Sequence, residues 1–108
     1  MRKKIYISGK IGEEVLSEAT RRKFARAEEV LKRAGYETFN PAASGLVAKA
    51  DALAAAKGTD FYREILLLDL QALAGCDGIA LLPDWADSPG ARAEYMFAAA
   101  IGLETILI

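Results

Sequence analysis

The run Ile79-Ala80-Leu81-Leu82 constrains the fold most strongly, because an unbroken apolar run of this length is typical of a strand buried on both faces. Such strands occur in parallel sheets that are covered by helices on both sides. Segments with strand and helix patterns alternate along the rest of the chain. We expect strands at residues 5–8, 36–39, 79–82 and 105–108, and helices at 17–34, 58–74 and 88–101. The alternation predicts an α/β fold with a four- to five-stranded parallel sheet in one domain, residues 1–108.

The predicted helix at 17–34 has one apolar side, whose members recur at three- and four-residue spacing. They are Phe24, Ala27, Val30, Leu31 and Ala34. Gly35 is suited to end this helix, because glycine adopts the left-handed conformation that follows many helices. The alanine-rich segment 42–57 allows two interpretations, a short helix or a mobile lid.

The composition excludes several classes of function. The chain has no histidine, which rules out Ser-His-Asp and Cys-His catalysis within it and argues against zinc, so we expect neither a metal nor a cofactor. Its formal net charge of −1 gives no support to binding of nucleic acid polymers or anionic membranes. Cys76 is the only cysteine, so no intrachain disulfide is expected. The sequence has no signal-peptide pattern and no apolar stretch of membrane-spanning length, so a cytoplasmic protein is expected.

Asp69 interrupts the apolar run at residues 65–70, where folding alone does not call for a carboxylate. Because a helix turns about 100° per residue, Asp69 lies on the apolar side of its helix, almost opposite the polar side. The polar side consists of Asp60, Arg63, Glu64 and Gln71, and the neighbours of Asp69 are Tyr62, Ile65 and Leu73. A buried ionised carboxylate is costly unless it is paired. Asp69 is therefore either a buried cap or ion-pair residue, or part of a site that uses acids for chemistry.

Glu94 is the second acid in an unexpected place, early in the predicted helix at 88–101. An acid in the first two turns complements the helix dipole, which explains a glutamate near this end. It does not explain why Glu94 shares a helix face with small residues. That face carries Gly90, Ala91, Ala98 and Ile101, and its small members leave room for a ligand over the carboxylate.

Two turns are candidate anion sites. The helix start at Ser88 offers a hydroxyl and free backbone N–H groups, and Gly90 lies in its first turn. Ser88 also suits a helix cap, and Pro89 suits the first helical position. The turn Gly9-Lys10-Ile11-Gly12 is a weaker phosphate-loop candidate, because it is not a Walker sequence. Both turns follow strands, and ligands of α/β folds collect beyond the carboxyl ends of strands.

The aromatic residues separate into two groups. Phe24, Phe39 and Phe97 have the positions of core residues. Trp85 lies in the loop before the helix at 88–101, where it is either a stacking wall for a base or an anchor in an interface.

Taken together, these motifs resemble the nucleoside 2-deoxyribosyltransferase-like superfamily, and in particular a small bacterial and phage branch of unknown function. The resemblance rests on Ile-Tyr-Ile-Ser-Gly at 5–9, on Asp69-Leu70 followed by Cys-Asp-Gly-Ile at 76–79, and on residues 88–94. It covers nearly the whole chain except segment 42–57. It implies a flavodoxin-like, three-layer sandwich and an enzyme that cleaves the N-glycosidic bond of deoxynucleosides or deoxynucleotides.

The resemblance also implies roles for individual residues. Glu94 matches the nucleophilic glutamate, Asp69 the aspartate that assists at the nucleobase, and Tyr6 the tyrosine that orients the nucleophile. Gly9 matches the glycine of the first-strand loop. The expected reaction is retaining: Glu94 attacks C1′ of a 2-deoxyribosyl group, and Asp69, with a pKa raised by burial, protonates or hydrogen-bonds the departing base.

Departures from the family pattern bear on the substrate. Transferases that act on free nucleosides carry an aspartate at the position of Ser88. A serine at this position is similar to the pattern of the 2'-deoxynucleoside 5'-phosphate N-hydrolases, in which the serine contacts the 5′-phosphate of the substrate. Asp87 still offers an acid if the loop is shifted, and Lys10 after Gly9 departs from the commoner loop forms. The expected partner is a small-molecule nucleotide or nucleoside, with phosphate recognition favoured.

Two further hypotheses remain open. The chain is a binding module that holds a nucleotide without breaking a bond, or it is an interaction protein. Leu67 and Leu70 lie near the polar side of the helix at 58–74, which makes that helix apolar almost all round. This predicts a homodimer or higher homo-oligomer packed through this region, an arrangement in which each subunit could complete the other's site.

Overall fold

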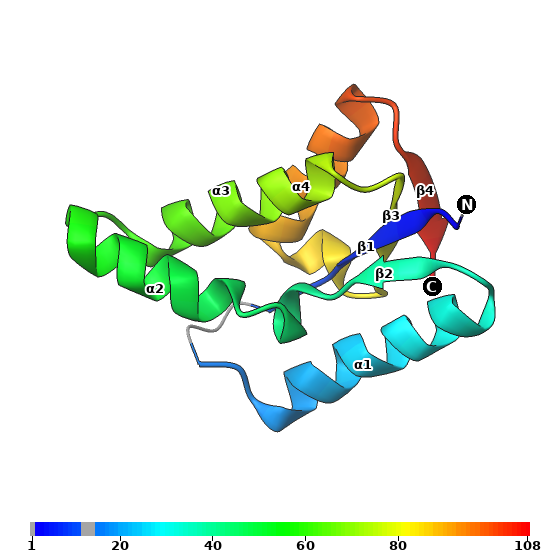
Figure 1. Cartoon of the computed structure of the whole chain (residues 1–108), viewed down its shortest axis with the longest axis horizontal. Coiled ribbons are helices and arrows are strands. Elements are labelled where there is room, and N and C mark those ends of the chain that lie inside the picture. Colours follow the sequence, from blue (N-terminus) through cyan, green and yellow to red (C-terminus); the bar gives the residue numbers. More distant parts are fainter. Residues whose placement is uncertain (1, 12–14) are drawn as a thin grey trace.

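The structure is a computed structural model, and it describes residues 2–11 and 15–108. Over these residues the strands are β1 (Lys4–Ser8), β2 (Glu37–Phe39), β3 (Gly78–Leu81) and β4 (Glu104–Leu107). The helices are α1 (Glu18–Arg33), α2 (Leu46–Lys57), α3 (Phe61–Ala74) and α4 (Pro89–Ala100), with 3-10 turns at Pro41–Ala43 and Trp85–Asp87. All strand pairs are parallel, in the order β2-β1-β3-β4. The predicted α/β class and flavodoxin-like topology are confirmed, with four strands in the described parts of the chain (Figure 1).

Strand β1 divides the interior into two cores, because successive side chains of a strand point to opposite faces of the sheet. Ile5 and Ile7 pack towards α1, whereas Tyr6 packs in the core on the side of α3 and α4. Ser8 follows Tyr6 by two residues and contacts Glu94 of α4, so it faces the same side. The strand therefore delivers two polar side chains to one face and two isoleucines to the other.

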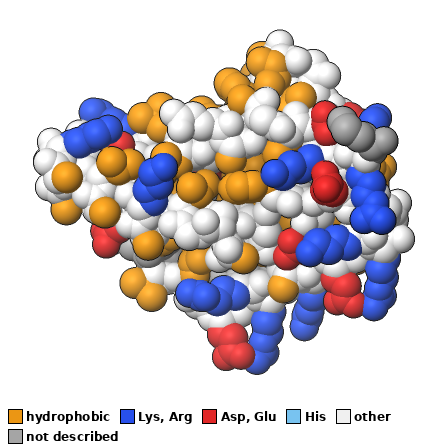
Figure 2. All heavy atoms as spheres, in the orientation of Figure 1, with side chains coloured by type: hydrophobic (Ala, Val, Ile, Leu, Met, Phe, Trp, Pro, Cys, Tyr) orange, Lys and Arg blue, Asp and Glu red, His pale blue; other side chains and the backbone are white. Residues whose placement is uncertain are grey.

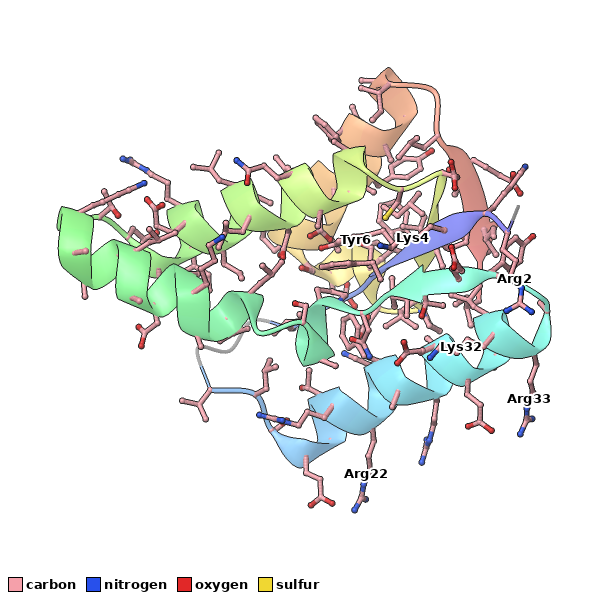
Figure 3. The ribbon with its side chains drawn as sticks, viewed as in Figure 1. Arg2, Lys4, Tyr6, Arg22, Lys32 and Arg33 are labelled. Carbon is pink, nitrogen blue, oxygen red and sulfur yellow. The ribbon has the colours of Figure 1, made fainter. Side chains whose placement is uncertain are left out.

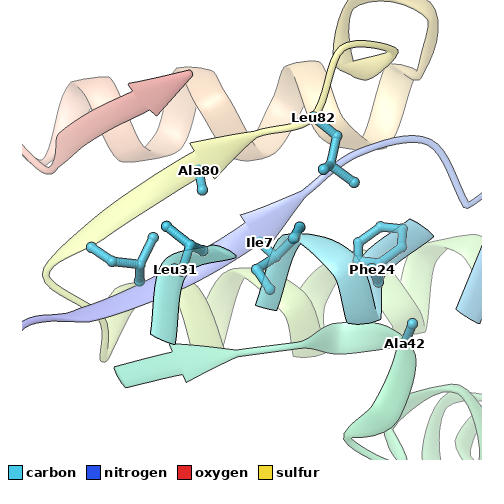
Figure 4. Packing of buried hydrophobic residues seen from close by; sticks show 8 residues of the cluster. Ile7, Phe24, Leu31, Ala42, Ala80 and Leu82 are labelled. Atoms are coloured by element: carbon cyan, nitrogen blue, oxygen red, sulfur yellow. The ribbon is translucent and has the colours of Figure 1, made fainter. Parts of the chain in front are cut away.

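The core on the α1 side is built around aliphatic side chains and one phenylalanine (Figure 4). Its buried members are Ile5, Ile7, Phe24, Ala27, Leu31, Ala42, Ala80 and Leu82. The predicted apolar side of α1 is thus correct for Phe24, Ala27 and Leu31. It is wrong for Val30, which is 52% exposed because it lies at the margin of the apolar stripe, and for Ala34, which is the exposed C-cap residue. Gly35 follows with φ +96°, as predicted for the residue that ends the helix.

The opposite core joins the sheet to α3 and α4. Leu73 of α3 and Ala98 of α4 pack with Tyr6, Cys76, Ile79 and Leu81, all of them buried. Phe39, Trp85, Tyr95 and Phe97 are partly buried against this cluster. The core prediction for Phe39 and Phe97 is therefore confirmed.

Segment 42–57, left open by the sequence, contains the end of the first 3-10 turn and helix α2. Helix α2 packs beside α3 as an antiparallel hairpin that projects from the sheet (Figure 1). The hairpin has its own small apolar cluster, with Ala50, Phe61 and Leu68 buried at its centre.

Glu64 corrects the predicted polar side of α3. It is only 4% exposed, because α2 and the turn before α3 cover it. The Thr59 hydroxyl donates to Glu64 Oε2 at 2.9 Å, and Lys57 Nζ lies 3.2 Å from Oε1. These hydrogen bonds and the lysine charge lower the pKa of Glu64 and tie the two helices together at their turn.

Charged and hydrophobic side chains are unevenly distributed over the surface. Figure 2 shows Lys, Arg, Asp and Glu side chains gathered along α1, and hydrophobic side chains over the α2–α3 hairpin. Among the described helices, none combines the length and the apolar character that a membrane crossing requires.

Gly9, which follows β1, is packed against Leu82, which follows β3. A Cβ at this position would lie 2.6 Å from Leu82 Cδ1 and 2.9 Å from Leu82 Cβ. We expect Gly9→Ala to lower the free energy of unfolding by about 1–3 kcal/mol, because a fully buried leucine has no room to move aside. Urea denaturation of the two proteins measures this difference.

Gly75→Ala is the matched control for this prediction. A Cβ at Gly75 would find its nearest neighbour, the Ala72 carbonyl oxygen, at an ordinary 3.5 Å. Equal stability of the Gly9 and Gly75 variants would contradict the close approach at Gly9.

Candidate active site

Glu94 lies at the centre of a buried polar cluster between β1 and α4. The Tyr6 hydroxyl donates to Glu94 Oε2 at 2.7 Å, and the Ser8 hydroxyl donates to Oε1 at 2.7 Å. Tyr6 and Ser8 are fully buried, and Glu94 is 6% exposed. The Tyr6 ring also stacks on Phe39, with centroids 5.6 Å apart and planes 7° from parallel, and Figure 3 shows Tyr6 in the interior. Each carboxylate oxygen of Glu94 therefore has its own rigidly held donor.

The start of α4 brings Glu94 to this position. Ser88 is the N-cap, and its hydroxyl oxygen accepts the Ala91 N–H at 3.1 Å, while Pro89 occupies the first turn. Ala91 and Ala98 are buried on the same side of α4 as Glu94. These small residues bring the helix close to the sheet, so that the glutamate reaches the end of β1.

Asp69 of α3 faces the same cluster and is 7% exposed. Its Oδ1 atom is buried and accepts no hydrogen bond from the described residues. Burial, followed by the negative charge of Glu94, raises the pKa of Asp69 to about 8. At neutral pH this carboxyl group therefore holds a proton.

The proton belongs to Asp69 because the two acids have different surroundings. Burial raises the pKa of Glu94 too, but hydrogen bonds from Tyr6, Ser8 and Asp69 oppose this effect by stabilising the carboxylate. Burial and the charge of Glu94 also raise the pKa of Tyr6 well above its ordinary value, so Tyr6 remains a donor. The surroundings of the two acids thus favour the proton on Asp69 and the negative charge on Glu94.

A cavity of about 500 Å³ opens onto the two acids beyond the carboxyl ends of β1, β2 and β3. Its apolar wall comes from Ile7, Ile11, Phe24, Pro41, Val47, Phe61, Ile65 and Leu66. Its polar lining comes from Tyr62, Asp69, Ser88 and Glu94. An apolar cavity of this size with a few convergent polar groups is typical of a small-molecule site.

The structure brings most of the predicted site residues together. Gly9, Asp69, Ser88, Gly90 and Glu94 line the cavity, and Tyr6 holds Glu94 from beneath. Because Pro89 lacks an N–H and Ser88 caps Ala91, the amide of Gly90 is the first-turn donor that remains for a ligand. Gly12 lies outside the described residues.

Besides Tyr6, two of the predicted site residues that the structure describes do not line the cavity. The Lys10 side chain is exposed, and its backbone N–H donates to Asp84 Oδ1 at 3.0 Å. Lys23 pairs with the other oxygen of Asp84 at 2.7 Å, so Asp84 fixes the loop after β1 to α1. Trp85 packs on Tyr95, with ring centroids 5.1 Å apart, and belongs to the core on the α3–α4 side.

One comparison with known proteins gives a match, and this match covers almost the entire chain. A family model described as a domain of unknown function, DUF4406, matches residues 3–107. The chain belongs to this family. A comparison with curated proteins gives no match.

Sequence reasoning missed two components of this DUF4406 site. Ser8 was not singled out, although the two-residue period of strands places its side chain beside that of Tyr6. The wall formed by Val47, Phe61 and Tyr62 was also missed, because it depends on the α2–α3 hairpin. In the described part of the DUF4406 domain, no three Asp, Glu or Cys side chains converge as a metal site would require.

The raised pKa of Asp69 predicts a pH-dependent stability. The folded protein keeps the Asp69 proton up to about pH 8, whereas the unfolded chain loses it near pH 4, so stability falls as the pH rises between these values. We expect Asp69→Asn to raise the free energy of unfolding by about 2 kcal/mol at pH 9 and to change it little at pH 4. Urea denaturation at the two pH values measures both effects.

Asp51→Asn, which changes an exposed aspartate on α2, is the matched control and should have the same small effect at both pH values. A loss of stability in Asp69→Asn at pH 9 would contradict the raised pKa of Asp69.

Proposed function

We propose that the protein cleaves the N-glycosidic bond of a 2'-deoxynucleotide or deoxynucleoside, with Glu94 as the nucleophile, and passes the deoxyribosyl group to water or to another base. The observation that carries this proposal is the pairing of a carboxylate held by two hydroxyls with a second, protonated carboxyl group at one cavity. Retaining glycoside chemistry requires this division between a nucleophile and an acid.

In the first step, an oxygen of the Glu94 carboxylate forms a bond to C1′ of the deoxyribosyl group. The bond between C1′ and the base nitrogen breaks, and its electron pair leaves with the base. The proton of Asp69 neutralises the departing base, which is general acid catalysis by a group whose pKa lies near the operating pH. The result is a glycosyl ester on Glu94, the free base and an Asp69 carboxylate.

In the second step, water or another base attacks C1′ and the ester bond to Glu94 breaks. Asp69, now a carboxylate, accepts the proton of the attacking group, which returns both acids to their starting states. Water gives hydrolysis, and a second base gives transfer. Tyr6 and Ser8 stabilise the Glu94 carboxylate when it leaves.

The remaining surfaces of the cavity support a nucleotide or nucleoside as substrate. The apolar wall from α2 and α3 suits the faces of a base, and the side-chain hydroxyl of Ser88 with the Gly90 amide suits an anionic oxygen such as that of a 5′-phosphate. The resemblance to nucleoside 2-deoxyribosyltransferase-like enzymes supports the same assignment for Glu94, Asp69 and Tyr6. Lys10 lies in the sequence between Gly9 and Ile11, which both line the cavity.

The direct test is incubation with a panel of deoxynucleosides and deoxynucleoside monophosphates, followed by chromatography for free base. We expect release of base by the wild type and a loss of at least about 1,000-fold in Glu94→Gln, which keeps the shape but not the nucleophile. The rate should fall above about pH 8, where Asp69 loses its proton. Mass spectrometry of stopped reactions should find the deoxyribosyl group on the wild type alone.

A folded wild type that releases no base from any of these substrates would contradict the proposal. The second candidate is then a binding module, which the largely apolar wall favours because it can hold a base without help from the acids. Thermal stabilisation by nucleotides, equal in the wild type and in Glu94→Gln and without turnover, would support this second function.

The chain is also proposed to form a homodimer through α3, because this helix exposes two large apolar side chains, Tyr62 and Leu67, each by 50%. We expect light scattering at micromolar concentration to give the mass of a dimer, and Leu67→Lys to give that of a monomer. Val30→Lys on α1, where Val30 is 52% exposed on the other side of the sheet, is the control and should remain dimeric. A wild-type monomer would contradict this arrangement.

A further inference from the structure

Ser8 is a buried polar residue to which the resemblance assigns no role. It is the last residue of β1, it is fully buried, and its hydroxyl donates to Glu94 Oε1 at 2.7 Å. The inference below rests on the proposed function, because it concerns the orientation of the proposed nucleophile.

The backbone holds Ser8 in place. Its carbonyl oxygen accepts the Leu82 N–H at 2.8 Å, and its Cα is paired in register with Leu81 of β3. Because these contacts tie the backbone of Ser8 to β3, its hydroxyl starts from a rigid position. The side chain has no access to solvent, so water does not readily replace the hydroxyl.

A single hydrogen bond would leave the plane of the Glu94 carboxylate free. The last torsion of a glutamate side chain has a broad energy minimum, so rotation about it costs little. Tyr6 holds Oε2 and Ser8 holds Oε1, and the two donors lie two residues apart on one strand. Two fixed donors, one to each oxygen, therefore fix the plane of the Glu94 carboxylate, which a single donor would leave free to rotate.

The groups around Glu94 make this second donor important. The titratable side chains that face it are Tyr6 from β1 and Asp69 from α3, and no cation contributes to its electrostatic surroundings among the described residues. Without Ser8, Glu94 would keep a single hydroxyl donor, Tyr6, beside the Asp69 carboxyl group. The carboxylate would then turn towards Asp69 and share its proton, which removes both the nucleophile and the acid.

We propose that Ser8 is a positioning residue, which holds Oε1 of Glu94 while Tyr6 holds Oε2, so that the carboxylate keeps one orientation towards the cavity and stays distinct from the acid on Asp69.

The test compares Ser8→Ala and Ser8→Cys with the wild type. Cysteine fills the space of the serine but is a weak donor, so the pair separates lost packing from a lost hydrogen bond. Ser44→Ala is the matched control, because it removes a serine hydroxyl from an exposed residue, the one that follows the first 3-10 turn. Thermal melts establish that each variant is folded.

The first readout does not depend on activity. Carboxyl-carbon NMR of protein labelled at Glu and Asp gives the titration of Glu94, whose signal is identified by its loss in Glu94→Gln. We expect the pKa of Glu94 to rise by about one to two units in both Ser8 variants, the range that corresponds to one charge-assisted hydrogen bond, and to stay unchanged in Ser44→Ala. An unchanged titration in Ser8→Cys would overturn the proposal, even if Ser8→Ala fails to fold.

The second readout uses the substrate that the base-release assay identifies. We expect kcat to fall by about 10- to 100-fold in the Ser8 variants with little change in KM, and the acid limb of the pH profile to move upward. A rise in KM at constant kcat would overturn the proposal, because it would assign Ser8 to substrate binding. A wild type without turnover whose Glu94 titration still responds to Ser8 would refute the glycosidase function while supporting the positioning role.

Discussion

The structure depends on keeping one negative charge in its interior. Ionised Glu94 lies between an apolar sheet and an apolar helical hairpin, and its burial is tolerated because Tyr6, Ser8 and Asp69 all act on its two oxygens. Removing any one of them leaves a buried charge with less support. Burial and the nearby charge of Glu94 raise the pKa of Asp69, so this carboxyl group holds its proton at neutral pH. The stability of the fold and the proposed chemistry therefore depend on the same few groups.

The fold makes this cluster accessible from one side. In the order β2-β1-β3-β4, the chain proceeds outward from β1 in one direction and from β3 in the other, so the loops after these two neighbouring strands diverge. Gly9 lies in the first of these loops, and the second leads into the capped start of α4. The gap between them is where the cavity meets both acids. The position of the site follows from strand order before any side chain is considered.

Much of this could be predicted from the sequence, because it depends on local patterns. The run at 79–82, the caps at Ser88 and Gly35, and the placement of Asp69 opposite the polar residues of its helix are local signals. Glu64 was misplaced because its burial depends on α2, a helix that the sequence left undecided. The sequence left Trp85 as a ligand wall or an interface anchor, and it did not predict the core contact, because that contact depends on Tyr95, ten residues away. Hydrophobic periodicity predicts individual helices and strands, but it does not predict which of them contact one another.

The α2–α3 hairpin has a consequence of its own. Its centre is a separate apolar cluster, closed at the turn by Glu64, Lys57 and Thr59, and it contributes Val47, Phe61 and Ile65 to the cavity wall. The carboxylate of Glu94, in contrast, is anchored to the sheet through Tyr6 and Ser8. Substitutions that reshape the hairpin can therefore alter which molecules the cavity admits while leaving the anchored acid undisturbed.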